Sequence, residues 1–373
     1  MAGPSFFIVS CDGGGIRGLI TAMLLEDLDA KCPGFLGKVD LFAGTSTGGI
    51  IALGLAAGIP TSTIRQLYEN DGGQIFVPFQ PGLLELFGYV KEYVDELLES
   101  SPMAHAEAAA MPAEGFGGLA STLRTIEDVF HVKYMADGLA QLLRKTFGAA
   151  MMSGIRPVLV ATYNIAPASV PSWRPLLLTN LSAPRNAHVD ALPAGDLAVV
   201  DVALATSAAP TFFPPHNVDS IGYCADGGLF ANNPSLFALN SVISRKNPAS
   251  TISMLSLGTG SIAQKVGAMP DPLAWGVGQW LLPKQTSSVP QLPLLQTLMD
   301  GQEQIADAQC AKMLRNRYMR VDLPLTELFP LDDLQSIPQM VQVTQDYIDG
   351  NTPPGTPAWQ DVVNWVGART GSE

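Results

Sequence analysis

The stretch VDLFAGTSTGGIIALGLAAG, residues 39–58, runs from a strand pattern into a helix pattern through the six residues GTSTGG. Its first part, VDLFAG (39–44), is apolar almost without interruption, which is typical of a strand covered on both faces. The same order of strand, loop and helix occurs near the start of the chain, in SFFIVS (5–10) and IRGLITAMLLEDLDAK (16–31). Two such units in succession predict an α/β fold around a parallel sheet.

The rest of the chain continues this pattern. Further strands are predicted at 156–164, 175–181, 220–226, 251–258 and 317–323. Several of them are followed by helix patterns, so we predict a three-layer α/β/α sandwich with a mostly parallel central sheet. One main domain is expected over residues 1–345, followed by a tail over residues 346–373 that contains a short helix.

Two segments interrupt the alternation. Residues 78–124 hold a helix-like run and then a stretch rich in alanine, glycine and methionine, which we interpret as an insertion or lid. Residues 269–295 carry Trp275 and Trp280 among leucines and prolines. Amphipathic aromatic side chains of this kind suit a lipid interface, but a subdomain packed on the sheet explains them equally well.

Composition narrows the classes of partner. The chain of 373 residues has 21 lysines and arginines against 34 acidic residues, a formal net charge of −13, which excludes a nucleic-acid or strongly anionic lipid partner. Hydrophobic residues make up 47% of the chain. None of the apolar runs reaches the roughly 20 residues that cross a membrane. A lipid-facing surface and a large core are both compatible with this apolarity.

The N-terminus and the cysteines indicate the compartment. MAGPSFFIVS lacks the charged start and the long apolar region of a secretory signal, so a cytoplasmic location is expected. The cysteines lie far apart without a CxxC pair, which favours reduced, buried thiols over disulfides or a zinc site. They are Cys11, Cys32, Cys224 and Cys310.

Ser46 lies at the centre of a G-x-S-x-G pattern between Gly44 and Gly48. A strand that turns directly into a helix leaves the middle residue strained and its hydroxyl projecting from the edge of the sheet, as in a nucleophile elbow. The following helix directs its N-terminus at this serine, which favours negative charge there. The competing interpretation is that Ser46 only caps the helix.

A nucleophilic serine needs a base. Of the four histidines, we interpret His105, His131 and His188 as surface or structural residues, which leaves His216 as the candidate for a Ser-His-Asp esterase. Asp226, in CADGGLFANNPS, is the better base, because Ser46 and Asp226 both follow buried strands and ligands bind at the carboxyl edge of such sheets. A simple Asp-Gly turn is the alternative explanation of Asp226.

The glycine run in VSCDGGGIRGL (9–19) explains how such a site stabilises charge. Acyl transfer passes through a tetrahedral oxyanion, which backbone N–H groups at a loop-to-helix junction stabilise. Gly13, Gly14 and Gly15 are the predicted donors. Arg17 is expected to hold the loop by pairing with a carbonyl or carboxylate, and Asp12 to fix the loop rather than to catalyse.

Five segments in order resemble the patatin-like phospholipases: DGGGIRG (12–18), GTSTGG (44–49), ATSAAPTFFPP (205–215), DGGLFANNP (226–234) and SLGTG (256–260). The resemblance implies a Ser-Asp dyad without a catalytic histidine, with Ser46 as nucleophile, Asp226 as base and Gly13–Gly15 as the oxyanion loop. It implies hydrolysis of fatty acyl esters of lipids through an acyl-enzyme, of the phospholipase A or lysophospholipase type. It implies no metal and no cofactor, a lipid substrate and a peripheral lipid interface.

Two other functions compete with acyl hydrolysis. Gly13, Gly15 and Gly18 also satisfy G-x-G-x-x-G, with Asp40 downstream, so a dinucleotide-binding protein is one alternative. In that fold the acidic residue should follow the second strand, whereas Asp40 stands near the start of VDLFAG. The other alternative is a lipid-binding module without activity, against which the intact Ser46 and Asp226 speak.

Overall fold

The structure, a computed structural model, describes residues 6–79, 132–167, 173–181, 190–244, 248–262, 280, 292–327 and 329–371. The predicted insertion at 78–124 lies outside these residues from residue 80 onward. The predicted lipid-facing segment at 269–295 also lies outside them, except for Trp280 and residues 292–295.

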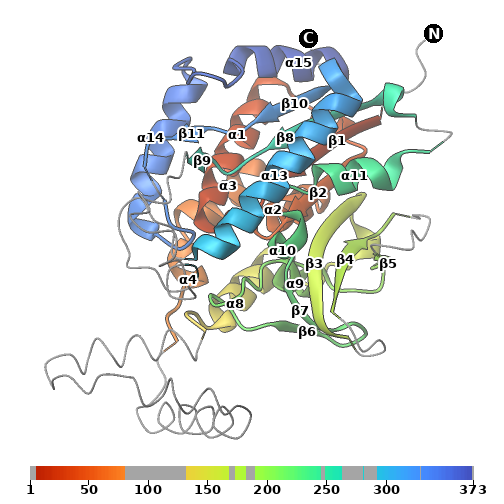
Figure 1. Ribbon diagram of the computed structural model, residues 1–373, viewed down its shortest axis with the longest axis vertical. Coiled ribbons are helices and arrows are strands. Elements are labelled where there is room, and N and C mark those ends of the chain that lie inside the picture. Colours follow the sequence, from red (N-terminus) through yellow and green to blue (C-terminus); the bar gives the residue numbers. More distant parts are fainter. Residues whose placement is uncertain are drawn as a thin grey trace, which may run out of the picture.

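The described chain begins with two strand–helix units, β1–α1 and β2–α2, and continues with groups of helices and groups of strands (Figure 1). The strands are β1 (Phe6–Cys11), β2 (Leu41–Thr45), β3 (Val158–Pro167), β4 (Arg174–Thr179), β5 (Asp190–Pro193), β6 (His216–Val218), β7 (Gly222–Asp226), β8 (Ile252–Leu257), β9 (Ser261–Ile262), β10 (Tyr318–Val321) and β11 (Pro324–Leu325). The helices are α1 (Gly18–Lys31), α2 (Thr47–Ala56), α3 (Thr61–Glu69), α4 (Gly72–Ile75), α8 (Ala136–Phe147), α9 (Val199–Thr206), α10 (Gly228–Ala231), α11 (Ser235–Val242), α13 (Pro293–Leu314), α14 (Ile337–Ile348) and α15 (Trp359–Thr370).

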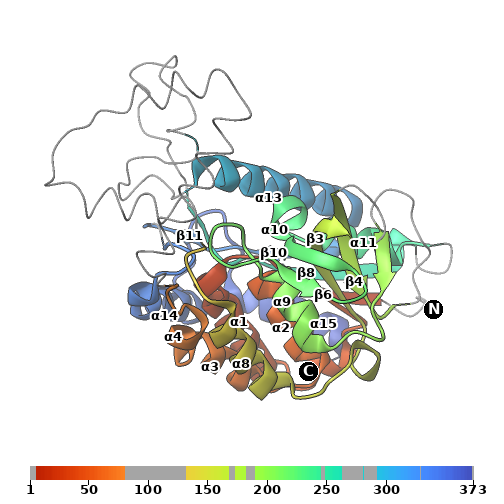
Figure 2. The ribbon, with the colours of Figure 1, turned by 90° about the horizontal axis from the view of Figure 1, so that it is seen from below.

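The central sheet has the strand order β10-β8-β1-β2-β3-β4-β5, with β7 also paired to β3 and β6 paired to β7. The strands from β10 to β3 are parallel to one another, whereas β4 and β7 run antiparallel to β3. Figure 2 shows α10, α11 and α13 over one face of the sheet and α1, α2, α8 and α9 over the other. The predicted three-layer α/β/α sandwich with a mostly parallel sheet is therefore confirmed.

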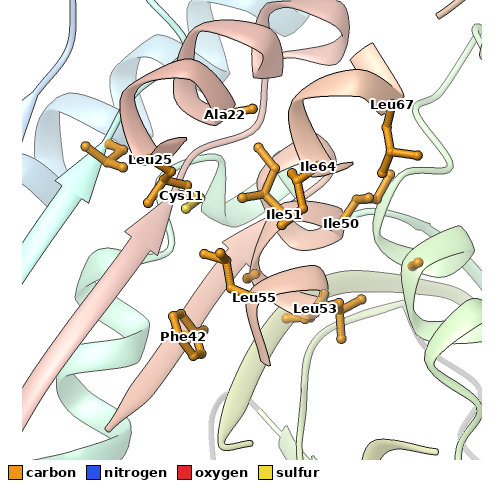
Figure 3. Close-up of a cluster of buried hydrophobic side chains, with 14 of the residues drawn as sticks. Cys11, Ala22, Leu25, Phe42, Ile50, Ile51, Leu53, Leu55, Ile64 and Leu67 are labelled. Atoms are coloured by element: carbon orange, nitrogen blue, oxygen red, sulfur yellow. The ribbon is translucent and has the colours of Figure 1, made fainter. Parts of the chain in front are cut away.

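Both faces of the parallel strands are buried, and each face has its own core. Every residue of β2 and of β8 is buried, as the uninterrupted apolar patterns predicted. The larger cluster fills the side of α1, α2 and α3, and Figure 3 shows part of it, with Phe42 from β2, Ile51 from α2 and Ile64 from α3. The smaller cluster lies under α11 and α13. The cores hold the carboxyl ends of β1, β2 and β7 in fixed positions.

The C-terminal segment is packed against the sheet domain. The predicted boundary at residue 346 falls inside α14, and α15 carries Trp359, Val362 and Val366 into the larger core. The ring of Trp365 lies against Phe7 of β1, with the centroids 6.1 Å apart. The residues after 345 therefore pack in the same unit as the sheet.

Two further features concern the cysteines and the length of the helices. All four cysteines are buried. In the described parts of the chain, every helix is too short or too polar to cross a membrane.

Candidate active site

Ser46 lies in the turn between β2, which ends at Thr45, and α2, which begins at Thr47. Its backbone has φ 54° and ψ −125°, a conformation that residues with a side chain rarely adopt. Ser46 occupies the N-cap position of α2, but its hydroxyl makes no capping hydrogen bond. Its backbone N–H donates to Thr206 Oγ1 at 2.9 Å. The hydroxyl is therefore free for a partner outside the helix.

The two glycines that flank Ser46 are required by the tightness of this turn. A Cβ on Gly44 would lie 2.0 Å from the carbonyl oxygen of Gly48, and a Cβ on Gly48 would lie 2.2 Å from the carbonyl oxygen of Cys11. Both obstacles are backbone atoms, which do not rotate away. A side chain at either position would therefore collide with the backbone of a neighbouring element.

Asp226 is the last residue of β7, and its carboxylate lies beside Ser46. Ser46 and Asp226 line the same pocket, and the N–H of Gly228 donates to Asp226 Oδ1 at 2.7 Å. Asp226 is only 5% exposed, and this burial raises its pKa to about 6, although the Ser46 side chain and the N–H of Gly228 both favour the ionised form and act in the opposite direction. The carboxylate thus lies in the same pocket as Ser46 and has the raised basicity that suits a general base.

The glycine loop lies next to Ser46, with Gly14 and Gly15 facing the same pocket. The N–H of Gly13 donates to the carbonyl oxygen of Asn232 at 3.0 Å, so this donor is already used. The amides of Gly14 and Gly15 have no acceptor among the described residues. The loop offers two free N–H groups beside Ser46, whereas the sequence predicted three.

Arg17 holds the glycine loop through backbone carbonyls, whereas the carboxylate of Asp12 pairs with Arg320 rather than with a group of the loop. Arg17 is buried, and it donates from Nε to the carbonyl oxygen of Gly14 at 3.4 Å and from Nη1 to that of Gly260 at 3.2 Å. Burial lowers the pKa of the Arg17 guanidinium. Asp12 Oδ2 lies 2.6 Å from Nη1 of Arg320 in β10. Burial raises the pKa of Asp12 despite this ion pair.

An apolar pocket opens at the Ser46–Asp226 pair. It holds about 790 Å³ of space, part of it open to solvent. Its wall consists mostly of hydrophobic side chains from α2, α4, α8, α10, α13 and the connecting loops, among them Ile50, Phe76, Phe213, Leu229, Met299 and Leu331. Such a wall accommodates a hydrocarbon chain and offers little to a charged ligand.

His216, the candidate base of a Ser-His-Asp esterase, and Asp40, the acidic residue of a dinucleotide-binding motif, lie away from the pocket at Ser46 and Asp226. His216 begins β6, its Nε2 lies 3.1 Å from Asp201 Oδ1, and it does not line the pocket. Asp40 precedes β2 and accepts the N–H of Phe7 at 2.7 Å, at the strand end opposite Ser46. The other histidines, His105, His131 and His188, lie outside the described residues.

Sequence reasoning gave no role to several residues that hold the site. Thr206, Asn232 and Thr259 contact Ser46 or the glycine loop, and each lies in one of the segments that carry the family resemblance. Arg320 lies outside these segments. In the sequence, Arg320 stands inside a strand pattern, and the next charged residue is Asp322. Opposite charges inside a strand pattern indicate a buried ion pair.

The chain matches one family model and is similar in sequence to several known proteins. The family model described as "Patatin-like phospholipase" matches residues 9–239. A "cGAMP-activated phospholipase" of Vibrio cholerae is 31% identical over 299 residues, which are 74% of this chain and 72% of that protein. A protein of the same name from Pseudomonas aeruginosa is 28% identical over 86% of this chain and 78% of that protein. "Patatin-like protein 3" of Arabidopsis thaliana is 28% identical over 84% and 73%.

Comparison with solved structures gives matches of low sequence identity and low TM-score. VipD from Legionella pneumophila is 12% identical with a TM-score of 0.40, and the match covers 92% of this chain and 67% of VipD. Human GIVD cytosolic phospholipase A2 is 10% identical with a TM-score of 0.35, over 99% of this chain and 61% of the human chain.

Proposed function

Because the chain belongs to the patatin-like phospholipase family, we propose that it is a serine lipid acyl hydrolase of the phospholipase A or lysophospholipase type. One observation carries the proposal: Ser46 and the buried Asp226 line one apolar pocket together with Gly14 and Gly15, whose N–H groups have no acceptor in the described part of the chain. The family supports a lipid-hydrolysing enzyme, and this arrangement supports the assignment of the two side chains.

The proposed reaction uses these groups in sequence. Asp226 accepts the proton of Ser46 as Oγ attacks the ester carbonyl, and the N–H groups of Gly14 and Gly15 bind the resulting oxyanion. When the ester bond breaks, Asp226 returns the proton to the departing alcohol, and the acyl group remains on Ser46. Water, activated by the same carboxylate, then releases the fatty acid and restores the serine.

The surroundings of the pocket support a substrate drawn from a lipid surface of low negative charge. Leu295 and Met299 of α13 line the pocket, and Leu294 and Leu298 on the same end of the helix are 40% and 53% exposed. Exposed leucines beside an acyl pocket suit contact with lipid. The net charge of −13 disfavours strongly anionic lipid. The peripheral lipid interface is therefore part of the proposal, and the cytoplasmic location stays a prediction.

Two relatives are named as cGAMP-activated, but the polar pocket near the site does not favour such an anion. It is lined by two arginines, Arg17 and Arg320, and by four acidic residues: Asp300, Glu303, Asp307 and Asp322. The acidic side chains outnumber the basic ones, and a dinucleotide phosphate would meet repulsion there. We therefore propose no nucleotide activation through this pocket.

Hydrolysis by variants tests the dyad. We expect Ser46→Ala and Asp226→Asn each to lower fatty acid release from phospholipid vesicles at least 1000-fold, on the order of the losses seen for catalytic groups. Both proteins should keep the wild-type circular dichroism spectrum. His216→Ala is the matched control and should retain wild-type turnover. Near-wild-type turnover by Asp226→Asn together with loss in His216→Ala would replace the dyad by a histidine mechanism.

A further inference from the structure

The carbonyl of Gly13 is held by two buried side chains that come from distant parts of the chain. Thr259 Oγ1 donates to Gly13 O at 2.9 Å, and Asn232 Nδ2 donates to the same oxygen at 3.4 Å. Both side chains are almost fully buried. We propose that Thr259 and Asn232 are positioning residues that aim the amide of Gly14 at the oxyanion formed on Ser46, an inference that rests on the proposed acyl hydrolysis.

Peptide geometry links the orientation of the Gly13 carbonyl to that of the Gly14 N–H. The carbonyl of Gly13 and the N–H of Gly14 belong to one planar trans peptide, so they point in opposite directions in the same plane. Fixing the carbonyl from one side therefore fixes the direction of the N–H on the other side, where Gly14 faces the pocket beside Ser46. Hydrogen bonds to the carbonyl also polarise the peptide, which makes its N–H a stronger donor.

The side chains of Thr259 and Asn232 also explain why positions 13 and 14 are glycines. A Cβ on Gly13 would lie 2.2 Å from Asn232 Oδ1, and a Cβ on Gly14 would lie 2.1 Å from Thr259 Oγ1. The space that a side chain would need is thus occupied by the groups that hold the peptide. Gly15 has a different reason, because its φ is 58° and its Cβ would meet the carbonyl oxygen of Leu331 at 2.2 Å.

Each positioning residue is itself anchored. The carbonyl oxygen of Asn232 accepts the N–H of Gly13, and its side-chain amide also donates to Glu303 of α13. Thr259 lies between Gly258, whose N–H donates to Val321 O at 2.8 Å, and Gly260, whose N–H donates to Asp322 Oδ1 at 3.0 Å. The Thr259 hydroxyl and the Asn232 side-chain amide therefore approach the carbonyl of Gly13 from positions that contacts with β8, β10 and α13 fix.

The pair Thr259→Val and Thr259→Ser tests the inference, because valine keeps the shape without the donor and serine keeps the donor. With a soluble, monomeric aryl ester, we expect Thr259→Val to lose about 10-fold in kcat with KM within about twofold, a partial loss relative to removing an oxyanion donor outright. A trifluoromethyl ketone, which forms an oxyanion on the serine, should bind correspondingly more weakly. Thr259→Ser should recover most of both quantities.

Three results decide the outcome. Unchanged kcat and inhibitor affinity in a folded Thr259→Val would overturn the inference, as would an equal loss in Thr259→Ser. If Thr259→Val does not fold, Thr259→Cys replaces it, since a thiol is a weak donor of similar size and should lose kcat relative to serine. Ser46→Ala is measured on the same ester. Retained turnover in Ser46→Ala would refute the proposed function itself, whereas loss there with no effect at Thr259 would refute only the positioning role.

Discussion

Ser46 is held in place by its backbone, and Asp226 is adjusted by its surroundings. The positive φ of Ser46 costs on the order of 1–3 kcal/mol, which the packing of β2 and α2 and the hydrogen bond to Thr206 offset. Asp226 needs no unusual backbone, because burial alone raises its pKa, while the Ser46 side chain and the N–H of Gly228 keep the ionised form accessible. The proposed nucleophile is thus held by its backbone geometry, and the pKa of the proposed base is set by its burial.

The pKa of Asp226 predicts a specific pH dependence. Its raised value of about 6 means that the carboxylate is ionised, and able to accept a proton, only above that pH. We expect kcat/KM for a monomeric ester to fall below pH 6, to about a tenth of its plateau at pH 5. Circular dichroism at pH 5 serves as the control for unfolding. An acid limb near pH 4, or one that disappears in His216→Ala, would contradict the assignment of the base.

At this scale the sequence pointed to the two side chains of the proposed dyad but not to how every amide is used. Ser46 and Asp226 stand in local patterns that require a turn after a strand, so their roles could be predicted from neighbouring residues. The use of the Gly13 amide could not, because its acceptor is the carbonyl of Asn232. Such a pairing depends on tertiary structure, which a local pattern does not contain.

Among the elements, α13 connects the pocket to the molecular surface. Leu298 is 53% exposed near the pocket end of this helix, and Ile305 is 61% exposed two turns further along. If the pocket end meets lipid, Leu298→Asp should weaken sedimentation with phosphatidylcholine vesicles and lower vesicle hydrolysis about tenfold or more. Hydrolysis of a monomeric ester should remain unchanged.

Ile305→Asp is the matched control for this prediction, because it adds the same charge on the same helix away from the pocket. We expect it to behave as wild type with both substrates. Equal losses in the two variants would show a general effect of charge, and unchanged vesicle hydrolysis in Leu298→Asp would refute a lipid-facing role of this end of α13.

The elements themselves were largely predictable, and their pairing was not. The five later strands predicted from apolar runs correspond to β3, β4, β7, β8 and β10. The antiparallel placement of β4 and β7 against β3 was not foreseen, because direction is set by contacts between distant segments. The short strands β5 and β6 carry too few residues to stand out in the sequence.

For the molecule as a whole, α15 ties the C-terminal segment to the first strand and helix. Trp359 is buried in the larger core, and its Nε1 donates to Asp27 of α1. We expect Trp359→Ala to lower the free energy of unfolding by about 3–5 kcal/mol in urea denaturation, because it leaves a large cavity. Gln360→Ala, on the exposed side of α15, should change it by less than about 0.5 kcal/mol. Equal stability of both variants would contradict the core position of α15.

Covalent labelling with a fluorophosphonate tests most directly whether Ser46 and Asp226 form the reactive pair. Mass spectrometry of the labelled, digested protein should place one adduct on Ser46. Its rate of formation should fall at least 100-fold in Asp226→Asn, since the serine then lacks its base. Labelling at a different residue, or labelling of Ser46 at the wild-type rate in Asp226→Asn, would contradict the dyad.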